Sequence, residues 1–107
     1  MRVLFVDDEP NVLDSIRRQL RKSCEVLTAT SGVEALALLK DTGPVALVIS
    51  DMRMPGMSGA ELLAKIRDLY PDTVRMILSG QADLDSTIAA INDGHIFRFL
   101  PKPSHEE

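Results

Sequence analysis

Short apolar runs alternate with amphipathic helical stretches along this chain, and that alternation restricts its fold more than any other feature. The apolar runs are typical of buried strands, whereas the stretches between them repeat apolar residues at helical spacing. We expect strands at Arg2–Val6, Glu25–Thr30, Val45–Ser50, Thr73–Leu78 and Ile96–Leu100. We expect helices over 11–22, 31–40, 58–69 and 85–92. Strands that alternate with helices in this way predict an α/β domain, with a parallel sheet and helices on both of its faces.

Two serines have the sequence context of helix N-caps. Ser31-Gly32-Val33-Glu34 and Ser58-Gly59-Ala60-Glu61 both match the capping box, in which serine and glutamate satisfy each other's backbone N–H groups. In the helix that follows Ser58, the predicted buried stripe consists of Leu62, Leu63, Ile66 and Leu69. The stripe of the last helix is shorter, and Gly94 is its predicted C-cap.

Composition and charge argue against several classes of protein. The chain has 107 residues, which is long enough to bury a core without disulfides. Its net charge of −4 argues against nucleic acid or an anionic membrane surface as the main partner. Cys24 is the single cysteine and cannot form an internal disulfide, so a cytoplasmic location is expected. No apolar run has the length of a membrane span, and the N-terminus has no signal-peptide pattern.

Side chains with useful chemistry follow four of the predicted strands. Asp7 and Asp8 follow the first strand, Asp51 the third, Ser79 the fourth and Lys102 the fifth. In parallel α/β sheets, ligands bind beyond the carboxyl ends of the strands, where the strand order reverses. We therefore expect all five side chains at one edge of the sheet. Each of them taken alone reads as an ordinary turn or surface residue, and it is their joint placement that favours a site.

Three carboxylates in a small space repel one another unless a cation binds among them. Mg²⁺ suits oxygen ligands and keeps several waters, and its open positions can take phosphate oxygens. A carboxylate such as Asp51 can then attack phosphorus and form an acyl phosphate. Lys102 would offer a positive charge to the phosphoryl oxygens, and Ser79 a hydroxyl donor. The pattern therefore predicts a Mg²⁺-dependent phosphoryl-transfer site.

Four segments of the chain together resemble the receiver domains of two-component response regulators. They are Phe5-Val6-Asp7-Asp8-Glu9-Pro10, Ser50-Asp51-Met52-Arg53-Met54-Pro55-Gly56-Met57-Ser58-Gly59, Leu78-Ser79-Gly80 and Phe99-Leu100-Pro101-Lys102-Pro103. The resemblance covers nearly the whole chain. It implies a flavodoxin-like, doubly wound parallel sheet of five strands in the order 2-1-3-4-5. It also implies phosphorelay signalling, in which Asp51 takes a phosphoryl group from the phosphohistidine of a sensor histidine kinase or phosphotransfer protein.

The resemblance implies which residues would hold the metal ion. Asp8 and Asp51 would be direct Mg²⁺ ligands, together with the backbone carbonyl of Arg53, and Asp7 would act mainly through a water. Arg53 and Gln81 occupy positions where the family varies and where the dephosphorylation rate is set.

The resemblance also implies how the domain would switch. Ser79 would move toward the phosphoryl group, and Phe99 would swing inward with it. Lys102 would contact the phosphoryl group, and the Lys102–Pro103 peptide would be cis. Such a domain is not an enzyme in the usual sense, because it catalyses only its own phosphorylation and dephosphorylation.

The end of the chain departs from the family pattern. Receivers usually continue past Lys102-Pro103 with a fifth helix, whereas only Ser104-His105-Glu106-Glu107 follow here. We expect residues 1–107 to be a receiver domain from the N-terminal part of a longer regulator, with the output domain C-terminal to it. Many receivers of this type dimerise on phosphorylation, and we expect no direct contact with nucleic acid or membrane.

Three other classes compete with this interpretation. A haloacid-dehalogenase-like phosphatase also uses an aspartate nucleophile and Mg²⁺, but it needs Asp-x-Asp, whereas Asp7 and Asp8 are adjacent. A pseudo-receiver that serves only as a binding module usually lacks the acceptor or the lysine, and here Asp51 and Lys102 are both present. A flavodoxin-like flavin or nucleotide binder would need a Gly-rich loop that the chain lacks.

Overall fold

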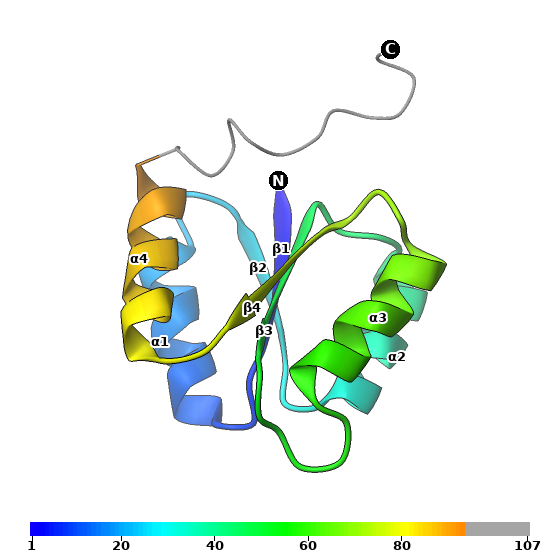
Figure 1. Cartoon of the computed structure of the whole chain (residues 1–107). Helices are drawn as coiled ribbons and strands as arrows, with labels where there is room; N and C mark the ends of the chain where they lie inside the picture. Colours follow the sequence, from blue (N-terminus) through cyan, green and yellow to red (C-terminus); the bar gives the residue numbers. More distant parts are fainter. Residues whose placement is uncertain (94–107) are drawn as a thin grey trace.

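In the computed structural model, which describes residues 1–93, a parallel sheet of four strands lies between two pairs of helices (Figure 1). The elements in chain order are β1 (Arg2–Val6), α1 (Pro10–Leu20), β2 (Glu25–Ala29), α2 (Gly32–Thr42), β3 (Leu47–Asp51), α3 (Gly59–Leu69), β4 (Val74–Leu78) and α4 (Gln81–Asn92). The strand order is β2-β1-β3-β4. This confirms the predicted doubly wound parallel sheet for its first four strands. The predicted fifth strand at Ile96–Leu100 lies outside the described residues.

The two central strands, β1 and β3, form the middle of the core. They pair in register from Val3 opposite Leu47 to Val6 opposite Ser50. All four of these residues are at most 1% exposed. Both strands are almost continuously apolar because helices cover them on both faces, as is typical of parallel sheets.

The core divides into two apolar clusters, one on each face of the sheet. On one face, Leu13, Ile16 and Leu20 of α1 pack with Ile88 and Ile91 of α4 against the sheet. On the other face, Ala35 and Leu39 of α2 pack with Leu62 and Ile66 of α3 against the sheet. Figure 1 shows the same division, with α1 and α4 on one side of the strands and α2 and α3 on the other.

The position of α4 differs from the position that the predicted strand order requires. A right-handed connection from β4 to a fifth strand beside it would place the intervening helix on the α3 face. Here α4 lies against α1 instead, and the hydroxyl of Ser23, in the turn after α1, donates to Asn92 Oδ1 at 2.7 Å. The packing gives a physical reason, because Ile88 and Ile91 of α4 join the apolar cluster on the α1 face of β4.

The predicted capping boxes form differently at their two sites. At α3 the box is complete, because Ser58 Oγ accepts from the Glu61 backbone N–H at 3.1 Å and Glu61 Oε1 accepts from the Ser58 N–H at 2.9 Å. At α2, Ser31 Oγ accepts from the Glu34 N–H at 3.0 Å, but the Glu34 carboxylate accepts from the backbone and hydroxyl of Thr30. Both arrangements satisfy backbone donors that would otherwise lack partners at a helix start.

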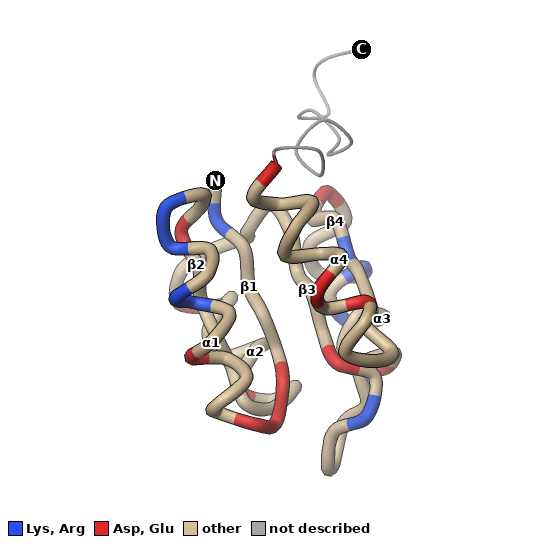
Figure 2. The backbone as a smooth tube through the Cα atoms, turned by 90° about the vertical axis from the view of Figure 1, so that its left-hand side faces the viewer, with Lys and Arg blue, Asp and Glu red and all other residues tan. Residues whose placement is uncertain are grey.

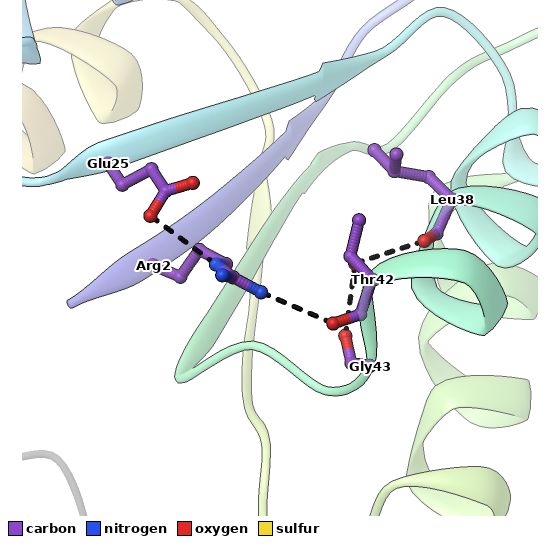
Figure 3. Close-up of polar contacts among 5 residues, drawn as sticks. All are labelled: Arg2, Glu25, Leu38, Thr42 and Gly43. Carbon is purple, nitrogen blue, oxygen red and sulfur yellow. Dashed lines mark hydrogen bonds and ion pairs between the residues drawn. The ribbon is translucent and has the colours of Figure 1, made fainter.

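At the amino ends of the strands, Arg2 joins three elements (Figure 3). Its Nε lies 3.4 Å from Glu25 Oε1 at the start of β2, and its Nη1 donates to the Thr42 carbonyl at 3.2 Å. Thr42 ends α2, so the arginine satisfies a carbonyl of the last helical turn. These contacts lie at the amino ends of the strands, whereas Asp7 and Asp51 lie at their carboxyl ends.

The structure corrects one prediction about the core. Leu69 was predicted to belong to the buried stripe of α3, but it is 61% exposed. Tyr70, four residues after Ile66, packs against the cluster instead.

We expect Leu69→Gln to change the free energy of unfolding by less than about 0.5 kcal/mol. Urea denaturation followed by circular dichroism measures this, and a loss of about 2 kcal/mol or more, as for a buried leucine, would show that Leu69 is buried in solution.

Within residues 1–93, the helices are too short or too polar to cross a membrane.

Candidate functional site

Three carboxylates meet at the carboxyl ends of β1 and β3. Asp7 and Asp8 follow β1, and Asp51 is the last residue of β3. Because Val6 lies opposite Ser50 in the parallel register, the next residues, Asp7 and Asp51, emerge side by side. One oxygen from each of the three carboxylates lies within 4.8 Å of the other two. Figure 2 shows acidic segments gathered at this end of the sheet, as the sequence predicted.

The surroundings of Asp7 disfavour its ionised form. Asp7 and Asp51 are half-buried, whereas Asp8 is exposed. Burial raises the pKa of Asp7 above its usual value, and the neighbouring carboxylates of Asp51 and Asp8 raise it further, although a hydrogen bond from the Glu9 backbone acts in the opposite direction. A cation bound beside Asp7 would therefore stabilise its ionised form. Such a cluster of oxygen donors suits a hard divalent cation.

Backbone hydrogen bonds fix the positions of Asp7 and Asp51. The Asp7 N–H donates to the Ala29 carbonyl at 3.1 Å, and Asp7 Oδ1 accepts from the Glu9 N–H at 2.9 Å. After Asp51, the Met52 N–H donates to the Leu78 carbonyl at 3.2 Å, which joins the ends of β3 and β4. Neither aspartate depends on a flexible loop for its position, and this favours a preorganised site.

The loop between β3 and α3 closes tightly behind Asp51. The Gly59 N–H donates to the Met52 carbonyl at 2.9 Å, and Gly59 packs directly against the backbone of Asp51. Gly56 has a φ of +81°, a conformation that favours glycine. Met54 of this loop is buried in the core cluster on the α2 and α3 face, whereas Met52 is exposed. Arg53 lies in this loop, and its carbonyl stays a predicted metal ligand.

A cavity of about 230 Å³ opens beside Asp7 and Asp51. Leu78, Gly80, Gln81 and Leu84 line its other side. Its volume gives room for a small oxyanion together with several waters. The first turn of α4 thus borders the same space as the carboxylates, and Gln81 is placed where it can contact whatever occupies that space.

Comparisons with known proteins agree with this architecture. Residues 3–107 match the response regulator receiver domain family. The chain belongs to this family. It is 42% identical over 101 residues to the hydrogenase transcriptional regulatory protein HoxA of Cupriavidus necator, covering 94% of this chain and 21% of that protein. The chain thus spans about a fifth of the length of such curated relatives.

Solved structures of receiver domains share the fold. A receiver domain protein from Clostridium thermocellum superposes with a TM-score of 0.69 at 37% identity, covering 87% of this chain and 75% of that one. The response regulator TrrA of Thermotoga maritima, crystallised in complex with Mg(2+)-BeF, gives a TM-score of 0.67 at 27% identity, covering 84% and 97%. The resemblance inferred from the four sequence motifs is confirmed, and the chain is a receiver domain of two-component, phosphorelay signalling.

Ser79 of this receiver domain does not point freely toward the carboxylates. Its hydroxyl donates to Asp83 Oδ2 at 2.6 Å, and its backbone N–H donates to the same oxygen at 3.1 Å. These two bonds lower the pKa of Asp83. Asp83 was not among the predicted site residues, although an acidic residue four positions after a serine, at a strand-to-helix junction, is a pattern that favours such a bond.

The bond between Ser79 and Asp83 also explains where α4 begins. The helix starts at Gln81 rather than at the predicted Asp85. Its N-cap is Gly80, which has no side chain to cap the helix, and Asp83 lies in the first turn. An acidic side chain at this place is favourable because the helix N-terminus carries partial positive charge.

Two predicted participants lie beyond the part of the chain that the structure describes. They are Lys102, the predicted cation, and Phe99, the predicted switch aromatic. The cis peptide predicted at Lys102–Pro103 lies outside the described residues as well. All three stay predictions.

Proposed function

We propose that Asp51 accepts a phosphoryl group in a Mg²⁺-dependent reaction from a phosphohistidine of a sensor histidine kinase or phosphotransfer protein. The observation that carries this proposal is the meeting of Asp7, Asp8 and Asp51 at the switch-point edge of a receiver domain. The phosphorylated domain then changes the activity of an output domain or partner protein. The chain spans about a fifth of the length of HoxA, which is the share expected of one domain in a longer regulator.

Asp8, Asp51 and the Arg53 carbonyl would bind the Mg²⁺ ion directly, and Asp7 would bind one of its waters. The donor set fits the metal, because every group is an oxygen and three of them are carboxylates. The raised pKa of Asp7 points the same way, since burial and, to a smaller extent, the charges of Asp51 and Asp8 disfavour its ionised form, which a bound cation would stabilise. The Mg(2+)-BeF complex of TrrA gives independent support from a relative. When bound, the ion neutralises charge on the transferring phosphoryl group.

The chain's own residues would then carry the transfer. A carboxylate oxygen of Asp51 attacks phosphorus, the bond between phosphorus and the histidine nitrogen breaks, and the electron pair stays on the imidazole. Asp51 is fixed by the β3 ladder and by the tight loop behind it, so attack costs little reorganisation. Lys102 and Ser79 would donate to the phosphoryl oxygens and share their added charge.

The domain would act as a switch without turnover of other substrates. We place it in the cytoplasm, because the buried free thiol of Cys24 suits a reducing compartment. Dimerisation on phosphorylation would use surface near α4, which borders the cavity beside Asp51.

Intact mass measured after incubation with Mg²⁺ and acetyl phosphate tests the proposed function. We expect one phosphoryl increment in the wild type, loss of the increment when EDTA replaces Mg²⁺, and no increment in Asp51→Asn. Asp41→Asn removes an exposed acid at the end of α2 and should behave like the wild type. A phosphorylated Asp51→Asn variant would place the acceptor elsewhere. Continuous hydrolysis of simple phosphate monoesters would favour the phosphatase interpretation instead.

A further inference from the structure

An acidic side chain in the first turn of α4 holds the residue before the N-cap, as Glu34 holds Thr30 at the start of α2, but at α4 the residue that is held is Ser79. In α3 the N-cap serine bonds within the capping box, and in α2 Ser31 caps while Glu34 reaches Thr30. At α4, Gly80 offers no side-chain cap, and Asp83 Oδ2 instead takes both the hydroxyl and the N–H of Ser79. Asp83 is therefore the polar side chain that connects the end of β4 to the first turn of α4.

We propose that Asp83 is a positioning residue that holds the Ser79 hydroxyl away from Asp51 in the unphosphorylated domain and must release it when the switch operates. This inference rests on the proposed function, because it needs a phosphoryl group on Asp51. The physical reason is competition for one proton. A serine hydroxyl has a single hydrogen to donate, so Ser79 donates either to Asp83 or to a phosphoryl oxygen, but not to both.

The competition links the phosphoryl group to α4. An aspartyl phosphate carries more charge than a carboxylate and offers several strong acceptor oxygens. Once Ser79 turns toward it, Asp83 keeps at most the backbone N–H of Ser79, now at 3.1 Å. The first turn of α4 then loses one of the two hydrogen bonds that Asp83 makes with Ser79. Gln81 and Leu84 of that turn line the cavity beside Asp51, so the change reaches the surface that borders the site.

Affinity for beryllium fluoride, a phosphoryl analogue, measures the competition directly. In Mg²⁺ buffer, titration calorimetry on the full chain should show Asp83→Ala binding beryllium fluoride about three- to tenfold more tightly than the wild type. Asp83→Asn keeps a neutral acceptor oxygen and should give a smaller gain. Asp93→Ala removes the same charge from the other end of α4, where it has no contact with Ser79, and should leave the affinity within about twofold.

The decisive comparison is made in the Ser79→Ala background. If Asp83 acts by holding the hydroxyl, Asp83→Ala has no effect on beryllium fluoride affinity once that hydroxyl is gone. A merely structural or electrostatic role for Asp83 would act equally in both backgrounds, and that result would overturn the inference, as would equal affinities for wild type and Asp83→Ala. A wild type that binds no beryllium fluoride and accepts no phosphoryl group would instead refute the proposed function. The melting temperatures of all variants show whether each one is folded.

Discussion

Replacing Asp7 by asparagine is expected to have opposite effects on Mg²⁺ binding and on stability. Asp7 would hold a water of the ion, and the loss of such an outer partner typically lowers metal affinity about 10- to 100-fold. Without metal, the same change removes one of three carboxylates that lie within 4.8 Å of each other, and it should raise the melting temperature by a few degrees. Calorimetric melting in EDTA and in Mg²⁺ measures both effects. Asp14→Asn removes an exposed acid of α1 and should change neither.

The pH dependence of this stability difference follows from the pKa of Asp7. That pKa is raised in the folded chain from the usual 3.8, mainly by burial and then by Asp51 and Asp8. The folded state therefore binds more protons than the unfolded state between pH 3.8 and the raised value, so stability falls as the pH rises through that window. The wild type and Asp7→Asn should have similar metal-free stability below this window, and the variant should become the more stable above it. A difference that does not change with pH would show that burial does not penalise the Asp7 charge.

The features that the sequence predicted correctly depend on local patterns. Apolar runs placed β1 to β4, and the serine at position 58 placed the start of α3, because periodicity and capping act over a few residues. The parallel order then brought Asp7, Asp8 and Asp51 together through the register of two neighbouring strands.

The features that the sequence missed depend on contacts between distant or competing groups. The face of the sheet that α4 covers depends on the apolar residues that Ile88 and Ile91 pack against, and these are not visible in the helix itself. Leu69 has the helical spacing of a buried residue, yet the chain turns directly after it and Tyr70 packs in its place. Asp83, which accepts the Ser79 hydroxyl four residues further along the chain, was not among the predicted site residues.

Gly59→Ala is expected to disturb both stability and phosphorylation, because a methyl group at this position would overlap the carbonyl oxygen of Asp51. The same methyl carbon would lie 3.1 Å from Met52 Cα, and backbone atoms cannot rotate aside as a side chain does. The first turn of α3 must then move away from β3, which shifts the proposed acceptor. Overpacking of this kind costs about 1–3 kcal/mol, and each kcal/mol lowers the melting temperature by about 4–8 °C in a domain of this size.

Gly32→Ala is the matched control for this prediction. Gly32 and Gly59 are both buried, and each directly follows a serine N-cap at the start of its helix. A methyl group at position 32 would meet only the Met57 side chain, with its Sδ at 2.6 Å, and methionine can adopt another rotamer. We therefore expect Gly59→Ala to lower the melting temperature and the rate of Mg²⁺-dependent phosphorylation by acetyl phosphate much more than Gly32→Ala does. Equal losses of melting temperature and phosphorylation rate in the two variants would mean that any side chain at the first residue of these helices is unfavourable. The contact between Gly59 and Asp51 would then not be what positions the acceptor.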